Sequence, residues 1–370
     1  MSPRLVVPAG LVALLLTAGL VAAPLTAASA ATPASAGSPA SSGAGAGPTW
    51  RLTPTGTTAR FRGLAAVSRQ VAWLGSTSGT ILRTVDGGRS WQDVSPPDTA
   101  ALQFRDIEAL DAWHAVALST GNGTDSRIYR TSDGGRSWQI AFTNDDPDAF
   151  YDCIAFSDPA RGLALSDPVG GAFRIAATAD GGRTWTVRPG AGMPAALPGE
   201  FAFAASGTCL VARPGGQFWF ASGGGAQTRV YRSVNGGRSW TVTDTPIASG
   251  AAAGIFSLAF SDSRHGIAVG GDFTTPAAAD RAAATTSDGG RTWTLVPADR
   301  APTGYRSGST FLPLGGPVAL AVGPTGSEIS LDRGHSWRQF DTGSFDSVRC
   351  GFFGGCWASG EQGRVAVLAG

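Results

Sequence analysis

The chain has few of the residues that bind metals or carry redox chemistry. Its 370 residues include four cysteines and three histidines. No Cys-x-x-Cys pair occurs, and His114, His265 and His335 are scattered along the chain. Zinc sites need clustered Cys and His ligands, and dinucleotide-binding folds need a Gly-x-Gly-x-x-Gly turn, which is also missing. The sequence therefore predicts no metal site and no cofactor.

The chain also lacks an excess of either charge. Lysine is absent, and the 28 basic residues are balanced by 27 acidic ones, which gives a formal net charge of +1. Proteins that bind nucleic acid or an anionic membrane surface through charge need a basic excess. We therefore expect no nucleic-acid partner and no electrostatic attachment to a membrane.

The N-terminus differs from the rest of the chain. Arg4 precedes an apolar stretch from Leu5 to Leu20, and Ala28-Ser29-Ala30 has the pattern of a signal cleavage site. We predict a signal peptide at 1–30 and no stable membrane insertion after its cleavage, with a retained anchor as the alternative. Residues 31–48 are Ala, Ser, Gly, Pro and Thr only, which predicts a flexible linker. The mature protein is expected to be secreted or held at the cell surface.

What the sequence has instead is a repeat. A string of the form Ser/Thr-x-Asp-x-Gly-x-Ser/Thr-Trp recurs in six copies, whose tryptophans follow one another at intervals of 44 to 55 residues. Between the copies there is no helical period, whereas the alternating segments 153–166 and 257–270 align with each other. Such a period with strand-like sequence is typical of a β-propeller. The third and last positions of the six copies are Asp86 and Trp91, Asp133 and Trp138, Asp180 and Trp185, Asn235 and Trp240, Asp288 and Trp293, and Asp332 and Trp337.

Each copy, called a box below, predicts a rigid turn between the third and fourth strands of a blade. The Asp carboxylate can accept hydrogen bonds from the N–H groups of its own turn, and glycine allows a positive φ. The Trp is suited to packing between blades. The alternative, in which these carboxylates bind metal or act in catalysis, fits less well because Asn235 replaces the Asp in the fourth box.

Although there are six boxes, the sequence predicts seven blades. After Trp337 the chain begins another unit, which stops before a box, and Thr49–Pro54 matches Thr292–Pro297. We expect the N-terminal strand to join the C-terminal blade, because this closure hides two exposed sheet edges. Residues 49–370 are thus predicted to form an all-β, seven-bladed propeller.

The four cysteines suggest two possible bridges. Cys350 and Cys356 flank a Gly/Phe turn, where a disulfide is plausible in an exported protein and free thiols are equally open. Cys153 and Cys209 lie on apolar strands of neighbouring repeats. There we expect buried free thiols, with a disulfide as the alternative.

A binding site is expected on the rim opposite the boxes, where the inner strands begin. Aligning the inner strands brings arginines, carboxylates and aromatic residues together at the mouth of a central channel. Such a ring suits a polar ligand or a peptide, and loops on rigid scaffolds carry function. The alternative is that these charges only hydrate a wide pore. The candidates are Arg62, Arg105, Asp106, Tyr151, Asp152, Asp167, Glu200, Asp272, Arg306 and Asp346.

Several segments resemble one family of propellers. They are residues 61–64, 150–156, 165–171, 196–208 and 268–273. They resemble exported bacterial Asp-box (BNR) repeat propellers related to the photosystem II stability/assembly factor. The resemblance covers 49–370 and implies a seven-bladed propeller with a non-enzymatic role through protein binding. Nothing in the sequence indicates photosynthesis, so we expect a monomer with an unknown protein or glycan partner.

The enzymatic alternative is a sialidase-like glycoside hydrolase, because sialidases also carry Asp boxes. Arg62, Arg105 and Arg306 would then hold a substrate carboxylate, and Asp152 would serve as acid and base. Tyr151 or Tyr305 with Glu200 would form the nucleophile pair. Glycosidases with two catalytic carboxylates hold them about 5 to 9.5 Å apart, which a structure can test. The sequence itself assigns no catalytic residue.

Overall fold

The computed structural model describes residues 47–190, 192–313 and 315–369. The predicted signal peptide and residues 31–46 of the predicted linker lie outside them, and these boundaries stay predictions. Within the described ranges, no helix is long and apolar enough to cross a membrane.

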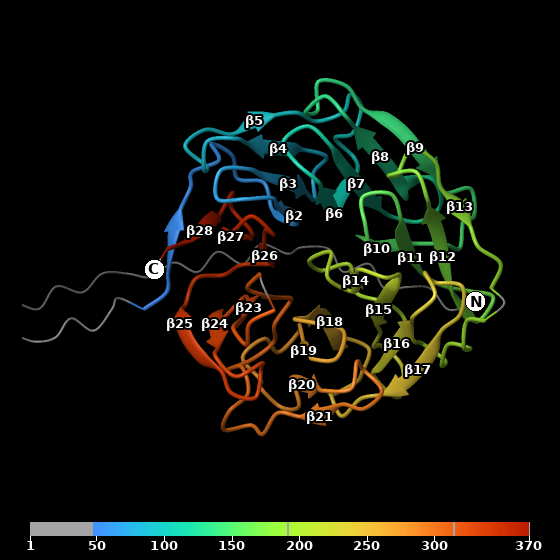
Figure 1. Ribbon diagram of the computed structural model, residues 1–370, viewed down its shortest axis with the longest axis vertical. Helices are drawn as coiled ribbons and strands as arrows, with labels where there is room; N and C mark the ends of the chain where they lie inside the picture. Colours follow the sequence, from blue (N-terminus) through green and yellow to red (C-terminus); the bar gives the residue numbers. More distant parts are fainter. Residues whose placement is uncertain (1–46, 191, 314, 370) are drawn as a thin grey trace, which may run out of the picture. The chain divides into compact units, whose positions relative to one another are not determined.

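Residues 49–369 form seven four-stranded antiparallel sheets arranged in a ring (Figure 1), which confirms the predicted seven-bladed β-propeller. Apart from strands, the described residues contain one 3₁₀ turn, η1 (Gly123–Asp125). From the ring centre outward, the first four blades contain β2 (Phe61–Ala66), β3 (Ala72–Ser76), β4 (Ile81–Thr84) and β5 (Gln92–Asp93); β6 (Gln103–Ala109), β7 (Ala115–Thr120), β8 (Arg127–Thr131) and β9 (Gln139–Thr143); β10 (Tyr151–Phe156), β11 (Gly162–Val169), β12 (Ala172–Thr178) and β13 (Thr186–Val187); and β14 (Leu210–Arg213), β15 (Gln217–Ala221), β16 (Arg229–Ser233) and β17 (Thr241–Asp244).

The last three blades complete the ring. The seventh sheet has the order β26-β27-β28-β1, so the first strand of the chain is the outer strand of the last blade, as predicted. In this closure Trp50 pairs with Leu368, and the Trp50 Nε1–H donates to Ser327 Oγ of the sixth blade at 2.9 Å. The strands are β18 (Ala253–Phe260), β19 (Gly266–Asp272), β20 (Ala283–Thr286) and β21 (Thr294–Leu295); β22 (Gly308–Phe311), β23 (Ala319–Gly323), β24 (Gly326–Ser330) and β25 (Arg338–Asp341); and β26 (Ser347–Cys350), β27 (Cys356–Ser359), β28 (Val365–Ala369) and β1 (Thr49–Leu52).

The core lies between neighbouring blades, where large aromatic side chains fill the space between two sheets. Trp138 of the second blade meets Trp73 of the first edge to face, with ring centroids 6.2 Å apart. Trp91 of the first blade meets Trp357 of the seventh in the same way, at 5.7 Å. Because Trp73 and Trp357 are fully buried, each such contact removes a large apolar area from water and fixes the angle between blades.

The six boxes occupy the turns between the third and fourth strands. In the third blade, Asp180 Oδ1 accepts hydrogen bonds from the backbone N–H groups of Arg183 and Thr184, each at 3.0 Å, and Oδ2 accepts one from the Thr184 hydroxyl. These bonds lower the pKa of Asp180 to about 2. Asn235 makes the equivalent bonds through its amide oxygen, so the turn forms without a carboxylate.

All four cysteines are in disulfides. Cys350 and Cys356 staple the β26–β27 hairpin. Cys153 in β10 is bonded to Cys209, the residue before β14. The expectation of free thiols at the second pair is therefore wrong, because neighbouring inner strands bring these two side chains within bonding distance.

The fourth blade departs from the regular pattern. Its inner strand β14 has only four residues and starts at Leu210. Residues 202–208, called the crossing segment below, instead reach side chains and backbone of the second, sixth and seventh blades. The crossing segment therefore lies at the centre of the ring.

Candidate functional site

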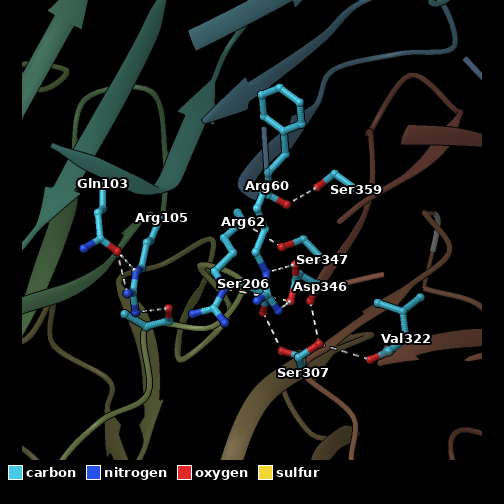
Figure 2. Close-up of polar contacts among 12 residues, drawn as sticks. Arg60, Arg62, Gln103, Arg105, Ser206, Ser307, Val322, Asp346, Ser347 and Ser359 are labelled. Carbon is cyan, nitrogen blue, oxygen red and sulfur yellow. Dashed lines mark hydrogen bonds and ion pairs between the residues drawn. The ribbon is translucent and has the colours of Figure 1, made fainter. Parts of the chain in front are cut away.

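Three arginines, called the arginine cluster below, lie beside the crossing segment where the inner strands begin (Figure 2). Arg60 precedes β2 and donates two hydrogen bonds to Asp346, from Nε to Oδ2 at 2.7 Å and from Nη2 to Oδ1 at 2.6 Å. Arg62 in β2 lies 3.8 Å from the same carboxylate. Arg105 in β6 completes the cluster. Asp346 belongs to the seventh blade, so this pairing also ties the first blade to the last.

Arg62 is held at the centre of the cluster with part of its guanidinium group unused. Its Nε is buried and has no hydrogen-bond partner among the described residues. Burial lowers the pKa of Arg62, the Asp346 carboxylate opposes this, and the positive charge of Arg60 lowers the pKa further. Two guanidinium groups thus compete for one carboxylate, which leaves Arg62 able to bind a further anion.

Arg105 is oriented by neutral oxygen atoms. Its Nε and Nη2 donate to Gln103 Oε1 at 3.0 and 2.6 Å, and its Nη1 donates to the Ala204 carbonyl of the crossing segment at 3.4 Å. Burial and the charge of Arg62 lower the pKa of Arg105 to about 10, while Asp152 raises it. Figure 2 shows the Arg62 and Arg105 side chains pointing in the same direction. At neutral pH both remain charged.

The crossing segment is fixed by polar contacts to the blades around it. Ser206 Oγ donates to the Ser307 carbonyl at 2.7 Å, and Ser307 Oγ donates to the Asp346 carbonyl at 2.7 Å. The Gly207 carbonyl accepts a hydrogen bond from Arg349 Nη2 at 3.1 Å. These contacts connect the segment to the backbone of Asp346, the residue whose carboxylate holds Arg60, so the arginine cluster has a rigid base.

An aromatic wall continues from the crossing segment. Phe203 stacks on Phe256 with centroids 3.8 Å apart, and Tyr305 meets Phe256 edge to face at 4.7 Å. Burial raises the pKa of Tyr305, and the positive charge of Arg62 opposes that rise, so the phenol lies within electrostatic range of the arginine cluster. A ligand that contacts both features would need a negative charge beside an apolar group.

A second charged group contacts the crossing segment at Gly207. Arg349 Nη2 is 3.2 Å from Glu108 Oε1 and 3.9 Å from Asp106 Oδ1. Asp106 is fully buried, and its Oδ2 accepts a hydrogen bond from the Ile154 N–H at 2.6 Å. Burial raises the pKa of Asp106 well above its ordinary value, and the Glu108 charge adds to that rise. Asp106 therefore lies inside the protein and not on the rim.

The structure separates several other predicted site residues from the arginine cluster. Arg306 is fully buried and pairs with Glu328, from Nη2 to Oε1 at 3.0 Å. Glu200 has no exposed side-chain surface and pairs with Arg229 in β16. Tyr151 packs in the core between the second and third blades, where burial raises its pKa to about 12. These three residues stabilise blades and do not line the rim.

The remaining predicted carboxylates are distributed among different surroundings. Asp152 is buried in β10 and acts electrostatically on Arg105. Asp167 accepts a hydrogen bond from the Ala202 N–H at 2.8 Å, at the start of the crossing segment. Asp272 accepts hydrogen bonds from the N–H and hydroxyl of Thr274 within its own loop. Across the described ranges, no group of three or more His, Cys, Asp or Glu residues is arranged to hold a metal ion.

Sequence reasoning missed Arg60, Glu108 and Arg349. Arg60 lies two residues before Arg62, and Glu108 lies two residues after Asp106. Residues two apart in an extended chain share a side, so this alternation could have identified both. Arg349 has no such signal, because its role depends on how the crossing segment is placed.

Solved structures with the same fold include two photosystem II assembly-factor chains. YCF48 from Cyanidioschyzon merolae aligns with a TM-score of 0.60 and 17% identity, over 86% of this chain and 98% of that one. YCF48 bound to D1 peptide aligns with a TM-score of 0.58 and 16% identity, over 87% and 97%. The GH74 enzyme of Niastella koreensis aligns with a TM-score of 0.54 and 16% identity, and this chain covers 51% of it. No family model and no curated protein sequence matches the chain. These identities show a shared fold.

Proposed function

We propose that this propeller is a binding protein that takes up an acidic peptide segment of a partner protein at the arginine cluster. The observation that carries the proposal is the crowding of Arg60, Arg62 and Arg105 around Asp152 and Asp346. Three guanidinium groups face two carboxylates, and the pKa values of Arg62 and Arg105 are lowered by burial and by their positive neighbours. A bound carboxylate would relieve that repulsion.

The fixed orientation of the donors supports a peptide ligand. Arg105 is held by Gln103 and by the crossing segment, so little conformational entropy is lost when it binds. Guanidinium groups bind carboxylates through two parallel hydrogen bonds. Phe203, Phe256 and Tyr305 are buried and pack behind the crossing segment, so they support the cluster from inside, and Phe201 is the partly buried aromatic residue of this group. The complex of YCF48 with D1 peptide is one case in which a propeller of this shape binds a peptide.

We also propose that the chain belongs with exported bacterial Asp-box propellers, acts as a monomer and is secreted or held at the cell surface. Two disulfides are consistent with an oxidising compartment. The role is non-enzymatic. A sialidase-like hydrolase would need Arg306 and Glu200 at an open site, and both are paired inside blades.

The test uses a synthetic library of acetylated hexapeptides, each made with a carboxylate and with an amide C-terminus. Immobilised protein should enrich acidic and carboxylate-ended peptides that carry a neighbouring apolar residue. The Arg62→Gln/Arg105→Gln variant should lose this enrichment, whereas Arg300→Gln, an exposed arginine outside the cluster, should keep it. Equal enrichment by all three proteins would refute the proposal.

A further inference from the structure

A groove with unusual chemistry lies between the third and fourth blades, on the box side of the ring. Two cavities there have volumes of about 240 and 390 Å³, and Arg188 and Arg238 line both. Asn235 and Arg161 line the larger cavity, and Trp240 lines the smaller one. We call this region the blade 3/4 groove. It is separate from the arginine cluster.

Arg188 stands where the first and fifth blades place valine. It is the third residue after the box Trp185, as Val94 is after Trp91 and Val296 is after Trp293. The backbone is equivalent at all three positions, because each N–H donates to the third strand of its blade, to Ile175, Ile81 and Ala283 respectively. Val94 and Val296 are buried, and Val94 lies against Gly135 of the next box. At the blade 3/4 junction this apolar contact is replaced by a guanidinium group.

The fourth box lacks the negative charge that the other boxes have, and the carboxylate lining the larger cavity, Asp158, is paired with Arg161. Asn235 fills the acidic position of the fourth box, so Arg238 lies beside a neutral amide. The hydrogen bonds made by the Arg188 and Arg238 side chains go to backbone carbonyls, of Gly236 at 2.5 Å and of Asn235 at 3.1 Å. Burial lowers the pKa of Arg188, and the charge of Arg238 lowers it further. Two neighbouring cations therefore repel each other at this junction.

A third donor belongs to a residue that lines the smaller cavity. In the second blade, the Trp138 indole N–H donates to the carbonyl of Val94, at 2.7 Å. Trp240 is the corresponding tryptophan of the fourth blade, and its corresponding acceptor would be Arg188. That bond is missing, and the buried Trp240 Nε1 has no hydrogen-bond partner within the part of the chain that the structure describes, as is also true of Trp91 and Trp293 in the first and fifth boxes. A buried indole N–H normally finds an acceptor.

We propose that the blade 3/4 groove binds a tetrahedral oxyanion, a phosphate or sulfate group, through Arg188 and Arg238. Such a group has several acceptor oxygens and a charge of about −2, and arginine forks bind it through paired hydrogen bonds. Arg161 is at the margin and is already paired with Asp158 at 3.3 Å, so it contributes less. The anion would supply the charge that Asn235 removes from this box.

The test is isothermal titration calorimetry at constant ionic strength with inorganic phosphate and with inorganic sulfate. Phosphoserine and glucosamine 6-sulfate then distinguish a peptide-borne group from a glycan-borne one. Arg188→Val restores the residue type of two other blades, and Asn235→Asp restores the common box residue, so both variants should fold. Each should weaken binding by about tenfold or more. Arg291→Gln removes the arginine of an ordinary Asp box and should leave binding unchanged.

Absence of phosphate and sulfate binding to the wild-type protein would overturn the proposal. So would a loss of binding in Arg291→Gln equal to that in Arg188→Val, because binding would then be spread over all the box arginines. Thermal melting of each variant checks the fold. Retention of binding in Asn235→Asp would also contradict the role given to the missing carboxylate.

Discussion

Asp106 of the second blade and Gly207 of the crossing segment lie in such close contact that a Cβ atom on Gly207 would stand 2.1 Å from Asp106 Oδ1. Gly207 also has a φ of 71°, which favours glycine. The contact holds the crossing segment against a buried carboxylate, and the Ala204 carbonyl of the same segment accepts a hydrogen bond from Arg105. The shape of the arginine cluster therefore depends on a glycine that belongs to a different blade.

Replacing Gly207 by alanine should destabilise the protein by roughly 1–3 kcal/mol or more, because the strained φ and the clash with Asp106 add together. Gly215→Ala is the matched control. Gly215 also has a positive φ, of 88°, but a Cβ there meets nothing within 4 Å. Chemical denaturation measures the unfolding free energy of both variants. If Gly207→Ala loses no more stability than Gly215→Ala, the crossing segment is not tightly held.

The free energy of unfolding of Asp106→Asn should increase relative to that of the wild type as the pH rises. The pKa of Asp106 is raised well above its ordinary value of 3.8 by burial, so the unfolded chain releases a proton that the folded protein retains. The stability of the wild type therefore falls as the pH rises from about 3.8 toward the raised pKa. Asparagine removes this titration and can still accept the Ile154 hydrogen bond. Chemical denaturation at pH 5, 6, 7 and 8 should show a growing difference in unfolding free energy between Asp106→Asn and the wild type. A difference that stays constant with pH would contradict this prediction.

Much of the fold was predictable from the sequence, because box turns and blade tryptophans are local features that recur at a regular interval. Trp50 and its neighbours predicted the closure of the ring in the same way. The site was harder to predict. Arg306 and Arg62 were both predicted to lie near the channel mouth, but Arg306 is buried and paired with Glu328 of the third strand in its own blade. That partner is set by tertiary packing and leaves no local sign in the sequence.

The position of the crossing segment could not be predicted from the sequence either. Residues 201–204 alternate phenylalanine and alanine as a strand does, and nothing local reveals that the crossing segment leaves the fourth blade. Their position depends on Arg349 and Ser307, which are far away in sequence. Hydrogen bonds between such distant residues cannot be derived from the periodicity of one chain.

Removing the Cys153–Cys209 disulfide should cost more stability than removing Cys350–Cys356. The sequence separations are 56 and 6 residues. Loop entropy then predicts losses of about 4 and about 2 kcal/mol for the two double Cys→Ser variants. Chemical denaturation of both variants under non-reducing conditions checks the order. The reverse order would mean that the long bridge does little to restrict the unfolded chain.

The box carboxylates should make the protein sensitive to acid. Asp180 and Asp288 have pKa values of about 2, below the ordinary 3.8, because hydrogen bonds favour the charged form. Their contribution to stability is present above about pH 4 and is lost as the pH falls toward 2. Asp180→Asn keeps an acceptor in the turn and should lose less stability at neutral pH than Asp180→Ala, for which we expect a loss of roughly 1–2 kcal/mol. Equal losses in the two variants would contradict the turn geometry.

The measurement that tests the central claim most directly is the affinity of the best library hexapeptide for the wild type and for Arg62→Gln, Arg105→Gln and Arg300→Gln. Fluorescence anisotropy with the carboxylate and the amide form of the same peptide gives both comparisons. Binding through the arginine cluster predicts a loss of about tenfold or more in each cluster variant, with no change in Arg300→Gln, and a similar loss for the amide form of a peptide whose only carboxylate is at its C-terminus. Equal affinity of all four proteins for both peptide forms would contradict the account.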